Sequence, residues 1–360
     1  MANKRNYKLA KGLVFRGKLI KIFNPKATKT SFDLTNKVTD FFLKGRKSSR
    51  FFSCETTITK SDGEPMRMVV YSSTPLETNI VSALQKCTIS EIKDEKIKND
   101  LKNEPEISVI PGELNKNRKK PIILWIHGGG YATGVPEQDF VFIDRMLETC
   151  DCIVVAPDYT LSMEKPYPCA LNDCYDALLW VKENACAFGA NDSQIFVGGD
   201  SAGGGLCAAI CLYARDKGEV NIAFQMPLYP MLDDRPTRTN ADNHAPGWNT
   251  PSNIEAWKLY LGDLYGKDVP YYAAPARATD YSNLPPALTY VGDIEPFTAE
   301  TEDYVENLRN CGIEVKFKLY KGCFHGFDVF GYGSKVAKDA ELFFIEGFLY
   351  AVNKYFAKQK

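Results

Sequence analysis

The stretch Ile195-Phe196-Val197-Gly198-Gly199-Asp200-Ser201-Ala202-Gly203-Gly204 decides the fold. Its apolar first residues predict the end of a buried strand, and residues 202–215 predict the helix that follows. Glycines on both sides of Ser201 permit a tight turn that lifts the serine above the sheet, so a nucleophilic serine is predicted. The alternative is a glycine-rich turn that binds phosphate at a helix N-terminus, but no P-loop lysine accompanies it.

Two of the three histidines lie in motifs on either side of this serine. His127 opens His127-Gly128-Gly129-Gly130, directly after a predicted strand, and we interpret it as a structural residue of that loop. His325 lies in Cys323-Phe324-His325-Gly326-Phe327, between a predicted strand and the last helix. Because histidine exchanges protons near neutral pH, His325 is the predicted general base, the alternative being a surface histidine without a catalytic role. His244 is interpreted as a turn residue.

The glycine run after the first histidine has a chemical use of its own. Without side chains, the backbone N–H groups of 128–130 can approach a substrate oxygen closely. Together with the Ala202 N–H at the start of the predicted helix, they would form an oxyanion hole. The order of glycine loop, serine and late histidine predicts a serine hydrolase on an α/β-hydrolase sheet.

From about residue 121 onward, short β-branched runs alternate with helix-length amphipathic stretches. This rhythm predicts an α/β fold with a mostly parallel central sheet and helices on both faces. Strands are predicted at 121–126, 152–156, 194–198, 223–229, 287–292 and 314–320, and helices at 170–187, 202–215 and 335–356.

Three segments do not follow this alternation of strands and helices. Residues 1–50 carry fourteen Lys and Arg against two acidic residues and predict an N-terminal helical cap segment that covers the active site. A place on a membrane surface is the alternative. Residues 51–360 form the predicted catalytic domain, with a charged surface insertion at about 75–119 and a cap insertion at about 232–268.

Bulk composition excludes several other classes of protein. The formal net charge is −1, so no global field attracts nucleic acid or a membrane. Eleven irregularly spaced cysteines without a C-x-x-C pair predict mostly reduced, buried thiols and no metal site. With no apolar run of about 20 residues and no signal-peptide pattern, we expect a cytoplasmic protein.

Further motifs make the chain resemble the hormone-sensitive-lipase family of α/β-hydrolases, which includes the bacterial family IV esterases. The similarity covers about residues 121–330. Ala156-Pro157-Asp158-Tyr159-Thr160-Leu161 is similar to the family's A-P-D-Y-R-L, with threonine where arginine is usual. The other stretches that carry the resemblance are Tyr167-Pro168-Cys169-Ala170-Leu171-Asn172-Asp173, the serine motif itself, Ala273-Ala274-Pro275-Ala276-Arg277 and Leu284-Pro285-Pro286-Ala287.

The resemblance implies roles for individual residues. The oxyanion-hole amides would be those of Gly129 and Gly130, beside Ala202. The family's acid motif G-x-x-D-P-[LF] corresponds to Gly292-Asp293-Ile294-Glu295-Pro296-Phe297, which places Glu295 at the acid position. Asp293 is the rival, because aspartate is the commoner residue in this role.

These features predict a serine carboxylesterase that hydrolyses small, short-acyl esters through an acyl-enzyme, with Ser201, Glu295 and His325 as the triad. No cofactor and no metal are needed. An amidase or arylformamidase with the same triad is one alternative, and a non-catalytic receptor on the same fold is another. The expected partner is a small-molecule ester, not nucleic acid or a membrane. The sequence does not define the oligomeric state, and a homodimer is one option.

Overall fold

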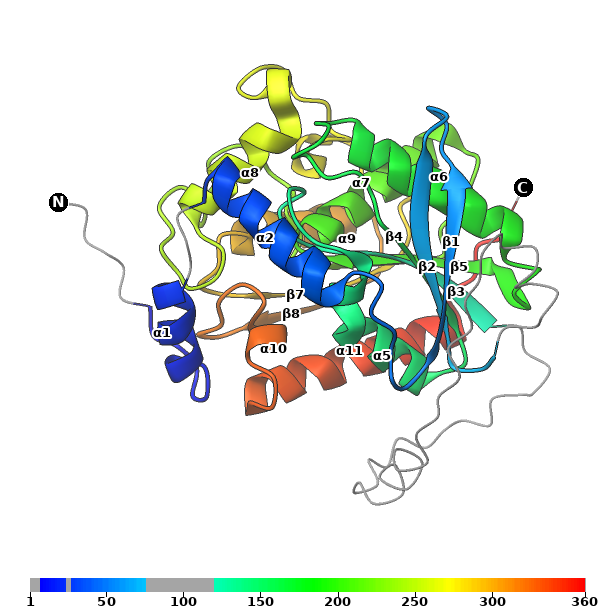
Figure 1. The fold of residues 1–360 in the computed structure, drawn as a ribbon, viewed down its shortest axis with the longest axis horizontal. Helices are drawn as coiled ribbons and strands as arrows, with labels where there is room; N and C mark the ends of the chain where they lie inside the picture. The colour runs from blue at the N-terminus through cyan, green and yellow to red at the C-terminus, as the bar shows by residue number, and fades with distance from the viewer. Residues whose placement is uncertain (1–6, 24–26, 76–119, 360) are drawn as a thin grey trace.

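The computed structural model describes residues 7–23, 27–75 and 120–359, so the predicted insertion at 75–119 lies almost wholly outside the described residues. Its centre is an eight-stranded sheet in the order β1-β2-β4-β3-β5-β6-β7-β8 (Figure 1). β2 runs antiparallel to β1 and β4, and the remaining pairs are parallel. The strands are β1 (Phe52–Thr59), β2 (Pro65–Ser72), β3 (Lys120–Ile126), β4 (Ile153–Pro157), β5 (Ala190–Asp200), β6 (Phe224–Leu228), β7 (Ala287–Gly292) and β8 (Val315–Tyr320).

Helices cover both faces of this sheet, which confirms the predicted architecture (Figure 1). One face carries α5 (Phe140–Thr149) and α11 (Lys335–Lys354), and the other carries α6 (Cys169–Asn184), α7 (Ala202–Lys217) and α9 (Thr298–Asn310). Shorter or peripheral helices are α1 (Val14–Phe23), α2 (Lys29–Leu43), α8 (Thr250–Leu261), α10 (Phe327–Phe330) and the 3-10 turns Pro136–Asp139, Gly262–Leu264 and Pro275–Arg277.

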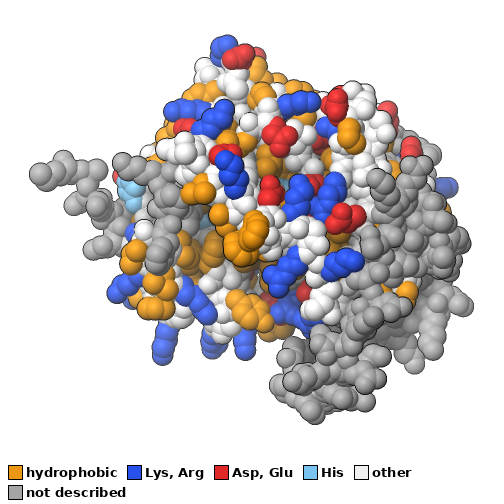
Figure 2. All heavy atoms as spheres, in the orientation of Figure 1, with side chains coloured by type: hydrophobic (Ala, Val, Ile, Leu, Met, Phe, Trp, Pro, Cys, Tyr) orange, Lys and Arg blue, Asp and Glu red, His pale blue; other side chains and the backbone are white. Residues whose placement is uncertain are grey.

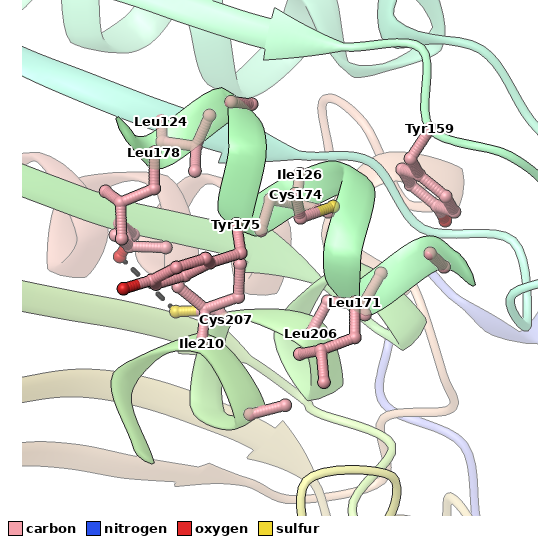
Figure 3. Close-up of a cluster of buried hydrophobic side chains, with 14 of the residues drawn as sticks. Leu124, Ile126, Tyr159, Leu171, Cys174, Tyr175, Leu178, Leu206, Cys207 and Ile210 are labelled. Carbon is pink, nitrogen blue, oxygen red and sulfur yellow. Dashed lines mark hydrogen bonds between the residues drawn. The ribbon is translucent and has the colours of Figure 1, made fainter. Parts of the chain in front are cut away.

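The central strands are apolar throughout because both of their faces are buried. Along β3, Ile122, Leu124 and Ile126 belong to the core beneath α6 and α7, whereas Ile123 and Trp125 belong to the core beneath α5 and α11. Figure 3 shows the first of these cores, where Leu171 and Leu178 of α6 and Leu206 of α7 gather beside Leu124 and Ile126. This packing holds the carboxyl end of β5, and therefore the turn at Ser201.

Several element boundaries differ from the sequence prediction. β5 begins at Ala190, four residues before the predicted start, and the predicted helix 170–187 ends at Asn184. The antiparallel pair β1–β2 was not predicted at all. Nine of the described cysteines are free thiols, six of them buried, and Cys54 is disulfide-bonded. In the described ranges, no helix is long and apolar enough to cross a membrane.

Candidate active site

Ser201 lies on the turn between β5 and α7, in a backbone conformation that side chains rarely adopt. Its φ is +55°, and its N–H donates to the Leu228 carbonyl at 2.9 Å. The flanking glycines are required by close backbone approach, because a Cβ on Gly199 would lie 2.4 Å from the Ile126 carbonyl oxygen and one on Gly203 only 1.9 Å from it. The motif therefore has a steric cause, and the strain at Ser201 is maintained by the packed strands around it.

Three predicted residues meet at this turn. The Oγ of Ser201 lies 2.8 Å from Nε2 of His325, and Nδ1 of His325 is hydrogen-bonded to Oε2 of Glu295. Glu295 is fully buried, and its Oε1 accepts the Gly292 N–H at 2.8 Å. A carboxylate at Nδ1 keeps the proton on that nitrogen and leaves Nε2 to accept from the serine hydroxyl.

Asp293, the rival acid, faces elsewhere. Its Oδ1 accepts the Gly322 N–H at 2.6 Å, and its own N–H donates to the Tyr320 carbonyl at 3.0 Å. The side chain thus joins the loop after β7 to the loop after β8 and stabilises both loops. The carboxylate that contacts His325 in the structure is that of Glu295.

The glycine loop after β3 is shaped by left-handed backbone. Gly129 and Gly130 have φ of +119° and +61°, and added Cβ atoms would lie 1.9 Å from the Thr133 carbonyl oxygen and 2.3 Å from the Trp248 ring. Within the described residues, no acceptor is found for the N–H groups of Gly129, Gly130 or Ala202. The Ala202 N–H is one of the first-turn donors that a helix leaves without a partner. The absence of an acceptor for these three amides is consistent with the predicted oxyanion hole.

His127 supports this loop without entering the chemistry. Burial lowers the pKa of its imidazole to about 4, so the ring is neutral at pH 7. Its Nδ1 lies 2.8 Å from the Gly128 carbonyl oxygen, and the ring stacks on Tyr159 with centroids 4.3 Å apart. The Tyr159 hydroxyl also donates to the His127 carbonyl at 3.0 Å. The interpretation of His127 as structural agrees with these contacts.

A buried pair of carboxyl groups beneath the loop was missed by sequence reasoning. Burial, together with the neighbouring Asp200, raises the pKa of Asp139 well above its ordinary value, and burial likewise raises the pKa of Asp200. Burial thus favours the neutral form of each carboxyl group, and the hydrogen bond between the two side chains allows them to share a proton. Trp125 Nε1–H donates to Asp139 at 2.8 Å, which fixes the pair against β3.

Ser201, His325 and the glycine loop line a cavity of about 550 Å³. The side of its wall that carries Ser201 and His325 comes from the loops at the strand ends. The opposite side comes from α1, α2, the segment before α8, and α10. Its lining residues are Ile20, Ala27, Ser31, Phe32, Thr35, Gly129, Gly130, Thr133, Gln138, Asp139, Asp200, Ser201, Tyr229, Gly247, Trp248, Ser252, His325, Gly326, Val329 and Phe330. The size and the mostly apolar wall suit a small organic substrate.

Of the bulky residues at 232–268, only Trp248 lines this cavity. It stacks on Phe32 of α2 with centroids 6.4 Å apart. Trp257 and Tyr260 turn inward and pack against Tyr131, because α8 buries that face in the core, and Tyr265 is a surface residue. Of these four aromatic residues, Trp248 is therefore the one that contributes to the cavity wall.

Known proteins are similar to this chain in sequence and in architecture. Esterase LipI of Mycobacterium tuberculosis is 34% identical over 209 residues, which is 58% of this chain and 65% of LipI. An arylesterase of Saccharolobus solfataricus is 27% identical over 251 residues, 69% of this chain and 80% of its own. The structure of a bacterial heroin esterase superposes with a TM-score of 0.75 at 28% identity, over 96% of this chain and 98% of that one.

The match to LipI thus spans just under two thirds of that relative's length. A family model described as alpha/beta hydrolase fold matches residues 123–329, more than half of the chain. That range contains the glycine loop, the serine turn, the acid loop and His325. The chain therefore belongs to the α/β-hydrolase family, in its hormone-sensitive-lipase-like group.

Proposed function

We propose that this chain is a serine carboxylesterase that hydrolyses small, short-acyl esters. The observation that carries the proposal is the hydrogen-bonded series Ser201–His325–Glu295 at the wall of an apolar cavity, beside three amides without acceptors. Relatives named as esterases support it.

In the first half of the reaction, Ser201 Oγ attacks the ester carbonyl carbon while its proton passes to Nε2 of His325. The carbonyl oxygen becomes an oxyanion, and Glu295 stabilises the positive imidazolium. As the tetrahedral intermediate collapses, the bond to the alcohol oxygen breaks and His325 returns the proton to that oxygen. The alcohol leaves, and the acyl group remains on Ser201.

In the second half, water replaces the alcohol and the same steps run in reverse. His325 takes a proton from water, the hydroxide attacks the acyl carbon, and Ser201 leaves with the proton from His325. The amides of Gly129, Gly130 and Ala202 would stabilise both oxyanions, each donor contributing roughly 3 kcal/mol. The proposed mechanism needs no cofactor.

The cavity wall supports a preference for short acyl chains. Phe32 and Trp248 are stacked across the cap side, and Phe32 is only 8% exposed. Two large rings held in contact leave little freedom for a long chain to pass between them, whereas acetyl to hexanoyl groups fit within a cavity of this size.

The test is a p-nitrophenyl acyl series, measured beside an anilide and a formamide, with the Ser201→Ala variant as control. We expect ester hydrolysis by the parent chain and a loss of kcat by about 10⁴-fold or more in the variant, to near background. Faster cleavage of the anilide or formamide would make the protein an amidase or arylformamidase. Saturable binding without turnover would make it a receptor.

A further inference from the structure

An apolar stripe on α2 faces solvent instead of the core. Leu34, Val38, Phe41 and Phe42 follow the spacing i, i+4, i+7, i+8, and they are 63%, 49%, 82% and 66% exposed. Such spacing ordinarily marks the buried face of a helix. Here the buried face is that of Phe32. Within α2, Phe32 therefore lines the cavity, whereas this stripe does not.

A second exposed stripe lies on α1 and continues onto α10. Phe15 and Ile22 are 72% and 73% exposed. The Arg16 guanidinium donates to the Gly331 and Tyr332 carbonyls at 3.1 and 2.8 Å, which holds α1 beside α10. We call the combined surface the apolar rim; its members are Phe15, Leu19, Ile22, Leu34, Val38, Phe41, Phe42, Val329, Phe330 and Tyr332.

The apolar rim borders the mouth of the catalytic cavity. Val329 and Phe330 line that cavity and are also exposed on the rim. Ile20 of α1 and Phe32 of α2 line it from the inner faces of the same two helices. A molecule held at the apolar rim is therefore adjacent to the entrance.

The two segments that carry most of the apolar rim are basic in sequence. Residues 7–23 and 27–50 contain eleven Lys and Arg against Asp33 and Asp40, a formal charge of +9, and of these cations Lys44 and Arg50 pair with Asp158 and Glu148 of neighbouring segments. Lys18 and Lys21 of α1 are exposed, and the described part of the chain offers them no carboxylate partner. Figure 2 shows hydrophobic side chains over α2 and beside α1, with Lys and Arg side chains among them. Exposed aromatic residues beside lysines are the composition of a helix that lies in a lipid interface.

We propose that the apolar rim docks on an anionic lipid surface. Its aromatic and aliphatic side chains enter the headgroup region, and the surrounding lysines contact the anionic headgroups. Docking in this orientation directs the cavity mouth to the lipid, so that esters dissolved in that surface reach Ser201. Substrate delivery rests on the proposed esterase function, whereas docking does not.

A second copy of the chain is the other occupant to consider. In a symmetric dimer the same patch lies on both sides of the interface, so the basic surface of one copy would face that of the other. Two basic surfaces brought into contact repel each other and oppose association, whereas an anionic surface attracts a basic one. The charge therefore favours lipid over self-association.

The experiment is co-sedimentation of the full chain with vesicles of phosphatidylcholine, alone or with 30% phosphatidylserine. We expect binding to the anionic vesicles only. Phe15→Ser with Ile22→Ser should reduce binding at least ten-fold, and Lys18→Glu with Lys21→Glu at least 25-fold, since each lysine near such a surface contributes about five-fold. None of these four residues lines the cavity, so turnover of p-nitrophenyl acetate should stay within two-fold.

Matched controls are Leu342→Ser with Tyr350→Ser and Lys267→Glu with Lys358→Glu, which change exposed residues that are not part of the apolar rim. Both should bind like the parent chain. The Ser201→Ala variant should also bind like it, so a failure of the esterase proposal leaves the docking result intact. Three results would overturn the proposal. The chain could bind neutral vesicles as well as anionic ones, or the lysine substitutions could weaken vesicle binding while the Phe15 and Ile22 substitutions do not. The chain could also be a dimer that the Phe15 and Ile22 substitutions dissociate.

Discussion

Replacement of Glu295 by glutamine tests the assignment of the acid most directly, because the structure specifies how the amide would orient. Oε1 of Glu295 accepts the Gly292 N–H at 2.8 Å, so the glutamine carbonyl oxygen must occupy that position. Its NH₂ group then faces Nδ1 of His325 and donates to it. The ring is driven to the tautomer with the proton on Nε2, which can no longer accept a proton from Ser201.

The cost follows from this change of tautomer. The equivalent carboxylate-to-amide change in a serine protease lowers kcat by about 10⁴-fold. We expect a loss of roughly 10³- to 10⁴-fold here, or about 4 to 5.5 kcal/mol in the activation barrier. KM for a p-nitrophenyl ester should change little, because Glu295 is fully buried behind His325 and does not line the cavity.

The matched control is Asp293→Asn. Its amide oxygen can still accept the Gly322 N–H, so kcat should fall by no more than a few-fold. Both variants would be assayed on the same ester at equal concentrations of folded protein, checked by circular dichroism and urea unfolding. A large loss in Asp293→Asn with near-normal turnover in Glu295→Gln would transfer the role to Asp293.

Three further predictions concern the loop, the pocket and pH. Gly130→Ala should lower kcat/KM by roughly 10²-fold, the loss expected for one oxyanion donor, because its Cβ would meet the Trp248 ring at 2.3 Å. In a double-mutant cycle, Trp248→Ala should restore part of the lost activity. Strict additivity of the two substitutions would contradict the steric cause. Among p-nitrophenyl esters, kcat/KM should be highest from acetyl to hexanoyl, and a maximum at dodecanoyl would indicate an open groove. Burial raises the pKa of Asp328 to about 6, so the stability that its protonated form contributes is complete below the unfolded pKa of about 3.9 and is lost as pH rises through 6. The free energy of unfolding of the parent, relative to that of Asp328→Asn, should therefore fall by up to about 3 kcal/mol between pH 4 and pH 7 in urea titrations. A difference that stays constant with pH would refute this prediction.

The sequence predicted which residues meet around Ser201 because the signals for them are local. The serine turn needs glycine at 199 and 203 where the Ile126 carbonyl approaches, so the steric requirement is visible as a motif. Glu295 was selected over Asp293 by its position before Pro296-Phe297, and the contacts of the two carboxylates agree with that selection.

Other features depend on which segments meet in space. Asp139 and Asp200 are 61 residues apart, and no sequence spacing predicts that they meet. Their side chains come together because β3, whose Trp125 binds Asp139, pairs with β5, which ends at Asp200. For α1 and α2, periodicity identified residues that share a face, but it does not state whether that face meets the core or solvent. The β1–β2 hairpin did have a local signal, since the turn dipeptide Asp62-Gly63 lies between the two strands and Gly63 has φ of +86°.

The two halves of the site are held together in different ways, and this difference separates chemistry from specificity. The catalytic half is fixed by backbone contacts too close for any side chain, as at Gly203 against the Ile126 carbonyl. The cap half is fixed by side chains, such as Asn36, which donates to the Ala132 carbonyl at 2.9 Å, and Phe32, which stacks on Trp248. Substitutions in α1 and α2 can therefore reshape the pocket and its surface while the serine turn keeps its geometry, so substrate range and lipid contact can change without altering the chemical steps.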